Sequence, residues 1–237
     1  MVGELTTSLI HDLKNPLLVV QLAADLLRKP NLGLSDHEKY CTVIEQQIRR
    51  ITGMSQEIME FVRGDSNLSV QETNLRELIL DLIGTYAEPF ANDGITLSLD
   101  IGNSKDDDLI VPVDADKLAR ALLNLVNNAR DAVTAGGKIS VSIKSLNDQV
   151  KIAVSDTGAG IPDEIKETIF EPFVTHGKSC GTGLGLAIVK RIIDAHGGGI
   201  SFESTLSVGT TFNITLPRRS PVQPATADLG KSHAMMA

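Results

Sequence analysis

Two runs of apolar residues, spaced alternately by three and four positions, dominate the first 62 residues of this 237-residue chain. This spacing is the seam of a heptad repeat and indicates a long helix that packs on another helix. The turn-like stretch KPNLG separates the two runs. The seams consist of Ile10, Leu13, Leu17, Val20, Ala24 and Leu27, and of Ile44, Ile48, Ile51, Ser55, Ile58 and Val62. The sequence therefore predicts a helical hairpin over residues 1–64.

A hairpin of two helices has too little core to stand alone, and two copies close it most simply as a four-helix bundle. We therefore expect a homodimer. Ser35, followed three positions later by Glu38, predicts a capping box at the start of the second helix.

After the hairpin, the pattern of the chain changes. Residues 65–73 are predicted to be a polar linker, and residues 74–217 alternate between strand-like and helix-like runs. The expected strands lie at 95–101, 109–114, 138–146, 150–156 and in two further runs before residue 217, and the expected helices at 75–92, 115–134 and up to 195. This order predicts an α/β sandwich with helices on one side of a mixed sheet, and an α+β fold for the whole chain. Residues 218–237 lack periodicity and are predicted to be a disordered tail.

Composition excludes several classes of function. A net charge of −8 and 3% aromatic residues argue against a nucleic-acid-binding surface. No apolar run reaches the ~18 residues of a membrane span. The two cysteines, Cys41 and Cys180, match no metal-ligand spacing, which favours a reduced, cytoplasmic chain. The expected partners are proteins or small molecules.

His11 lies outside the seam of the first helix, one turn before Asn15. An isolated histidine of this kind is most often a solvated surface residue. Here Asp12 can orient one ring nitrogen and leave the other as a nucleophile, while Lys14 supplies a cation. Pro16 lacks an N–H donor and is expected to bend the helix beside them. Such an exposed imidazole suits attack on an electrophile.

The predicted helix over 115–134 places Asn124 and Asn128 on one face, with Asp131 nearby. Asparagine is a poor helix former, so two on one face indicate a polar task such as holding a hydrated Mg²⁺ beside phosphates. The alternative is a merely polar surface.

The stretch VSDTGAGIP, residues 154–162, ends a predicted strand in Asp156. A carboxylate there can accept a hydrogen bond from an adenine amino group, and Gly158 and Gly160 allow close approach of the backbone. A plain turn is the alternative.

A glycine-rich loop, HGKSCGTGLGLAIV, opens the helix before residue 195. It is not a P-loop, because Pro172 stands where the first glycine is required, and it follows no strand as a dinucleotide fingerprint would. A helix N-terminus after such a loop favours phosphate oxygens, and Lys178 can add a charge. The residues concerned are Gly181, Thr182, Gly183, Leu184 and Gly185.

These motifs occur in the order found in two-component sensor histidine kinases, which the chain resembles over residues 5–217. HDLKNP resembles the H box, NLVNNARDA the N box, DTGAGI the G1 box, FEPF the F box and GTGLGLAIV the G2 box. The resemblance implies that His11 accepts the phosphoryl group and that Asp12 activates it. It implies Asn124 and Asn128 as contacts to Mg²⁺ and nucleotide, and Asp156 as the adenine-binding residue. The nucleotide site would further include Asp131, Gly158, Gly160, Lys178 and the G2 residues from Gly181 to Gly185.

The resemblance also implies an activity and its partners. A homodimer would phosphorylate itself from Mg-ATP and pass the phosphoryl group to an aspartate of a response-regulator receiver domain. Asn15, where many members carry threonine, would orient water in dephosphorylation of that receiver.

Phe170 and Phe173 either pack the base of the ATP lid or belong to the ordinary core. The histidines His37, His176 and His196 are interpreted as structural, His196 as a cation at a helix end.

Two rival functions belong to other classes. ATP-hydrolysing enzymes of the same superfamily carry a glutamate as general base one turn before the asparagine, where this chain has Asn124, which takes no proton. A nucleotide-dependent scaffold without phosphotransfer is the other. The chain shows no sensor, membrane or receiver segment, so we expect the sensor in a separate or missing module.

Overall fold

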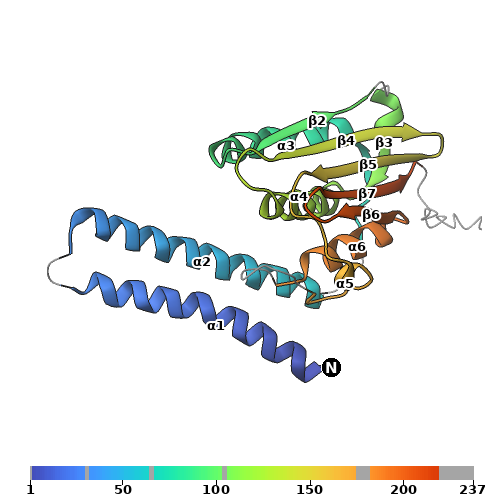
Figure 1. Ribbon diagram of the computed structural model, residues 1–237. Helices are drawn as coiled ribbons and strands as arrows, with labels where there is room; N and C mark the ends of the chain where they lie inside the picture. Colours follow the sequence, from blue (N-terminus) through green and yellow to red (C-terminus); the bar gives the residue numbers. More distant parts are fainter. Residues whose placement is uncertain (1, 30–31, 64–66, 103–105, 175–181, 219–237) are drawn as a thin grey trace, which may run out of the picture.

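The computed structural model describes residues 2–29, 32–63, 67–102, 106–174 and 182–218. A hairpin of two long helices is followed by a sheet domain, and helix α2 lies between helix α1 and that domain (Figure 1). The tail predicted for 218–237 lies, apart from its first residue, outside the described residues.

The hairpin consists of α1 (Val2–Leu27) and α2 (Leu34–Arg63). Helix α1 continues without interruption through Pro16, the position at which the sequence predicts a bend. Helix α2 begins one residue before Ser35, and the Gly33 carbonyl accepts the N–H of His37 at 3.0 Å. The capping box predicted at Ser35 is therefore wrong, because Ser35 already lies inside the first turn.

The predicted seams are only partly covered within one chain. The seam residues Leu17 and Ile48 are 53% and 52% exposed, whereas Ala23 and Met54, which lie beside the predicted seams, are buried. The face with which the two helices contact each other is thus not the whole apolar surface of the hairpin.

The sheet domain opens with a short strand that sequence reasoning missed. Strand β1 (Gln71–Asn74) pairs antiparallel with β3 (Ile110–Val113) and begins inside the predicted linker. Its partner lies about 40 residues further along the chain, so no local pattern marks it.

Five strands form the main sheet, in the order β2-β4-β5-β7-β6. Strands β2 and β4 are parallel and the other neighbours antiparallel, which confirms the predicted mixed sheet. The strands are β2 (Thr96–Asp100), β4 (Lys138–Leu146), β5 (Gln149–Asp156), β6 (Gly199–Thr205) and β7 (Gly209–Pro217).

Three helices cover one face of this sheet, as predicted (Figure 1). They are α3 (Leu75–Asn92), α4 (Ala115–Ala132) and α6 (Gly185–Ala195), with the short α5 (Asp163–Lys166) and the 3₁₀ turn η1 (Asp106–Leu109) at the margins. Alternate residues of β4 and β5 point into the core, among them Ile143 and Ile152, which belong to the same buried cluster as Leu122 and Leu125 of α4. This apolar layer holds the ends of β5, α4 and α6 in fixed positions.

A buried polar link joins the start of α4 to the end of α6. The N–H of Asp114 donates to Nε2 of His196 at 2.9 Å, and Nδ1 of His196 lies 2.8 Å from the Ile192 carbonyl. Nε2 is therefore unprotonated, and the prediction of a cationic His196 is wrong. Burial opposes ionisation of Asp114, but the N–H groups of Ser69 and Lys117 together with nearby positive charge, such as that of Lys117, outweigh it and lower the pKa of its carboxyl.

Candidate functional site

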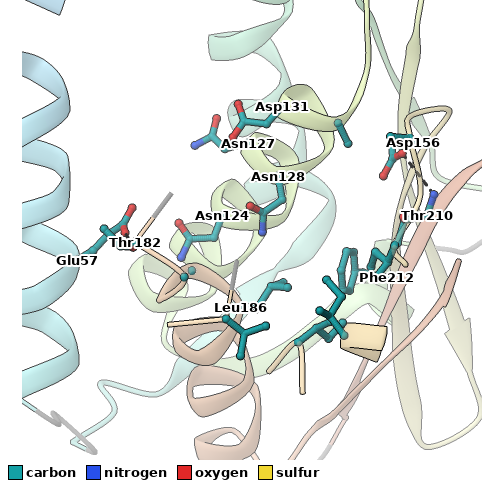
Figure 2. A pocket seen from close by; sticks show the side chains of 18 of the residues that line it. Glu57, Asn124, Asn127, Asn128, Asp131, Asp156, Thr182, Leu186, Thr210 and Phe212 are labelled. Atoms are coloured by element: carbon teal, nitrogen blue, oxygen red, sulfur yellow. Dashed lines mark hydrogen bonds between the residues drawn. The ribbon is translucent and has the colours of Figure 1, made fainter. Parts of the chain in front are cut away.

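A cavity of 630 Å³ lies where the end of β5, one face of α4 and the start of α6 meet helix α2 (Figure 2). Its size suits a nucleotide-sized ligand. The predicted residues that line it are Asn124, Asn128, Asp131, Asp156, Gly160, Thr182, Gly183 and Gly185.

The other predicted site residues lie elsewhere or outside the described part. Gly158 and Leu184 are buried and do not line the cavity. Lys178 and Gly181 fall outside the described residues. His11 and Asp12 lie within α1, but their side chains are not among those described, and Asn15, expected on an exposed face, is half-buried.

Asp156 ends β5 at the sheet side of the cavity. Its Oδ1 accepts the N–H of Gly158 at 2.8 Å and that of Thr210 at 3.3 Å. Burial raises the pKa of this carboxyl, and the two N–H donors offset part of the rise. Asp156 is thus a fixed, half-desolvated acceptor, which can read the amino group of a base.

Asn124 and Asn128 occupy the face of α4 that looks into the cavity (Figure 2). The amide nitrogen of Asn124 is buried without a hydrogen-bond partner in the described structure. Buried polar atoms in proteins nearly always have a hydrogen-bond partner, so this amide nitrogen is suited to donate to a bound ligand. There is open space between this face of α4 and the start of α6. A Cβ added to Gly185 would have no neighbour nearer than Nδ2 of Asn128, at 4.0 Å.

Two glycines of the motifs are required by the fold itself. Gly183 has φ +68°, and a Cβ on it would come within 2.5 Å of the Phe173 backbone. Gly158 packs against the end of α4, where its Cβ would meet the Ala132 carbonyl at 2.5 Å. Gly158 therefore permits a close approach of backbone to backbone, and not of backbone to ligand as the sequence suggested.

The two phenylalanines left open by the sequence have different roles. Phe170 packs edge-on against Phe202 and Phe212 at 6.0 and 6.4 Å, within the core beside the cavity. Phe173 instead meets Phe61 of α2, with ring centroids 5.9 Å apart.

Sequence reasoning missed the contribution of α2 to the site. Arg49, Arg50, Gly53, Met54 and Glu57 all line the cavity. A signal was present, since positions 50, 54, 57 and 61 form a second stripe at spacings of 4, 3 and 4 beside the predicted seam.

Two further residues on strand β7 were missed. Thr210, which is buried, donates to Asp156, and Phe212 forms part of the cavity wall. Strand β7 lies more than 50 residues from Asp156 in sequence, so only the pairing of β5 with β7 reveals their proximity.

Contacts fix α2 against the sheet domain. The Thr182 hydroxyl donates to a Glu57 carboxylate oxygen, and Arg191 donates to the Phe61 carbonyl at 3.0 Å. The Arg191 guanidinium also lies over the Phe61 ring, 5.8 Å from its centre.

None of the described helices is both long and apolar enough to span a membrane. The described part also contains no cluster of three acidic, histidine or cysteine side chains that could hold a metal ion.

Residues 1–67 match the family described as "His Kinase A (phospho-acceptor) domain". Residues 113–220 match the family described as "Histidine kinase-, DNA gyrase B-, and HSP90-like ATPase". The chain is 33% identical to sporulation kinase D of Bacillus subtilis, over 92% of this chain and 42% of the relative. It is 34% identical to the histidine-protein kinase AtoS of Escherichia coli, over 91% of this chain and 34% of the relative. The chain thus spans less than half the length of these relatives.

Solved structures show the same relationship. The catalytic domain of histidine kinase ThkA is 35% identical, with a TM-score of 0.58 over 64% of this chain and 99% of that domain. ThkA in complex with the response regulator TrrA is 28% identical, with a TM-score of 0.74 over 92% of this chain and 62% of that one. Both halves of the chain match, and residues of the N, G1 and G2 boxes surround one cavity. The chain therefore belongs to the two-component histidine kinases and carries the catalytic core of that family.

Proposed function

We propose that this chain phosphorylates His11 from Mg-ATP and passes the phosphoryl group to an aspartate of a response-regulator receiver domain. The observation that carries the proposal is the cavity, which unites Asn124, Asn128 and Asp156 with the start of α6. It lies in the same chain as a helical hairpin that bears the histidine.

Each wall of the cavity has a task in this reaction. Asp156 accepts the adenine amino group, and Gly160 and Asp131 border the nucleotide. The N–H groups at the start of α6, following Thr182 and Gly183, face the phosphates together with the α6 dipole. A ring nitrogen of His11, oriented by Asp12, attacks the γ-phosphorus. The lone pair of that nitrogen forms the N–P bond as the bond from the γ-phosphorus to the ADP oxygen breaks, and ADP leaves with the electron pair of the broken bond. The proton on the other ring nitrogen is then lost toward Asp12.

The donors present fit a magnesium ion. Asn128 and Asn124 would hold it by their amide oxygens, since an amide side chain can present either its nitrogen or its oxygen. Mg²⁺ in nucleotide sites keeps several waters and binds through few protein ligands plus the phosphates, as this site requires. The ion would neutralise charge on the phosphates.

Incubation with γ-labelled ATP and Mg²⁺ tests the proposal. We expect label that is lost in acid and kept in alkali, as for a phosphoramidate, and no label in His11→Gln. His37→Gln is the matched control, because His37 lies on the same hairpin and is assigned no role. Label that persists in His11→Gln would contradict the assignment.

Hydrolysis of ATP by this chain is the alternative from another class. We infer that it is slow, because Asn124 stands where hydrolytic members need a carboxylate base. A scaffold that binds nucleotide without phosphotransfer would show the cavity's affinity for ATP but no label on His11.

We further propose a homodimer through residues 1–64. The ATP-binding domain extends to residue 217 and begins with strand β1 at Gln71, inside the connection predicted for residues 65–73. Apolar side chains left exposed on the hairpin support the dimer. The complex of ThkA with the response regulator TrrA supports a receiver domain as partner. A cytoplasmic location follows from the need for ATP.

Asn15 is proposed to orient the water that removes phosphate from the receiver, because an amide can do so without ionising. We expect Asn15→Ala to keep autophosphorylation and lose most receiver dephosphorylation. Pro16→Ala serves as the comparison, with an altered balance of the two activities. A purified Asn15→Ala protein that clears receiver phosphate as fast as the parent would remove this role.

A further inference from the structure

One wall of the cavity belongs to the hairpin and not to the ATP-binding domain. Helix α2 presents two stripes, the predicted seam toward the bundle and a second one that faces the cavity and the start of α6. Met54 of this second stripe is only 5% exposed, and Phe61 packs at the edge of the sheet domain's core. Helix α2 is therefore built into the site.

The cavity has a direction. Figure 2 shows Asp156 and Thr210 at one side, Glu57 and Thr182 at the other, and Asn124 and Asn128 between them. If Asp156 binds adenine, as proposed above, the phosphates extend past the asparagines toward α2. The α2 wall is thus the phosphate end of the cavity.

Charges along the cavity differ between its two walls. Its acidic lining residues are Glu57, Asp131 and Asp156, and the basic ones among the described lining residues are Arg49 and Arg50, both from α2. A nucleoside triphosphate carries several negative charges and needs cations nearby. Within the described part of the cavity wall, α2 supplies them.

Glu57 does not cancel this positive end. Its carboxylate accepts from the Thr182 hydroxyl and interacts electrostatically with Arg120, which also interacts with Arg191. Burial lowers the pKa of Arg120, an effect that the Glu57 charge opposes and that of Arg191 reinforces. The negative charge of Glu57 is thus compensated from the sheet-domain side.

Resting on the proposed function, we infer that Arg50, assisted by Arg49, contacts the nucleotide phosphates and completes the site from the hairpin. Arg50 is half-buried at the cavity wall, whereas Arg49 is exposed and pairs with Glu45 at 3.2 Å. A bound nucleotide then bridges the ATP-binding domain and α2.

Calorimetric titration of the whole chain with ADP, a non-hydrolysable ATP analogue and adenosine, in Mg²⁺ buffer, tests the inference. For Arg50→Gln we expect about tenfold weaker binding of both phosphorylated ligands, the loss of one charge-assisted contact, and unchanged adenosine affinity. Arg49→Gln is expected to lose less, and Arg50→Lys to recover part of the loss.

Arg28→Gln is the matched control, since Arg28 is an exposed arginine of the same hairpin at a salt-bridge distance of 4.0 Å from Asp25. It should bind all three ligands like the parent. Parent-like binding of ADP by Arg50→Gln would overturn the inference, and so would an equal loss for adenosine, which would reveal a merely structural role. Failure of the parent chain itself to bind ATP or ADP would instead refute the proposed function.

Discussion

The hairpin and the sheet domain bury their apolar residues in different ways. Every fully buried member of the large core belongs to the sheet domain, while Ile58 and Phe61 of α2 only pack at its edge. Among the described side chains of the hairpin, many large apolar ones are exposed to solvent. These are Leu17, Leu18, Val19, Leu22, Leu34, Ile48, Met59 and Val62.

This difference separates a self-contained unit from one that needs partners. The sheet domain satisfies its hydrophobic pattern within one chain, because the sheet and the helices on one of its faces enclose a layer. In the hairpin, some apolar side chains lie between the two helices and others face the cavity. The remaining apolar side chains are exposed to water. A second copy of the hairpin would cover that remainder.

The largest effect is expected in the sheet-domain core. Ile152 is fully buried at the centre of β5, and Ile152→Ala should lower the free energy of unfolding by about 3–4 kcal/mol through lost burial and a cavity. Urea unfolding followed by circular dichroism measures this. The 50%-exposed Leu146, on the neighbouring strand, provides the control, and Leu146→Ala should change stability by less than about 0.5 kcal/mol. Equal losses for both variants would contradict the comparison.

A smaller, purely intermolecular effect is expected on the hairpin. Ile48→Glu should weaken the proposed dimer by about 2 kcal/mol, because a half-exposed isoleucine loses its burial at the bundle interface. Sedimentation equilibrium would show a shift toward the monomer, with ADP binding retained. Val208→Glu alters a 67%-exposed apolar residue of the sheet domain and should leave the mass unchanged. A dimer of unchanged strength in Ile48→Glu would place the interface elsewhere.

The smallest effect concerns pH and the sheet domain alone. Because burial raises the pKa of Asp156, its carboxylate should become protonated at a higher pH than an ordinary aspartate. Affinity for ADP should therefore fall by about fivefold as the pH drops through that raised pKa, since the acceptor for the adenine amino group loses its charge. Titration calorimetry from neutral to mildly acidic pH measures the change.

Asp156→Asn separates this effect from protonation of adenine itself, because the variant retains only the latter. It should bind ADP more weakly at neutral pH and lack the additional step. A parent protein whose pH profile coincides with that of Asp156→Asn would show that Asp156 does not titrate in this range.

Local patterns in the sequence predicted most elements correctly. The heptad spacing revealed both long helices, and the alternation in β4 and β5 revealed the central strands, because each pattern records which face of an element avoids water. Strand β1 escaped prediction because its stability comes from β3 and not from its own residues QETN.

The candidate site divides in the same way. Asn124, Asn128 and Asp156 could be selected from the sequence, since polar residues placed on a helix face or at a strand end contradict the local preference and need another reason. Thr210 could not, because it reaches the cavity only through long-range packing. The stripe that contains Arg50 and Glu57 is visible in the sequence, but only the packing shows that this stripe faces the cavity.

By itself, the sequence determined the element order, the apolar faces and the motifs of a phosphoryl-transfer core, all of which depend on residues within a few turns of one another. The tertiary structure alone decided what each face meets. It placed Gly158 against the end of α4, made Nε2 of His196 the acceptor of a backbone N–H and made helix α2 a wall of the cavity. A periodic pattern indicates that one face of a helix or strand must be buried. Only the packing of segments distant in sequence decides which element buries it.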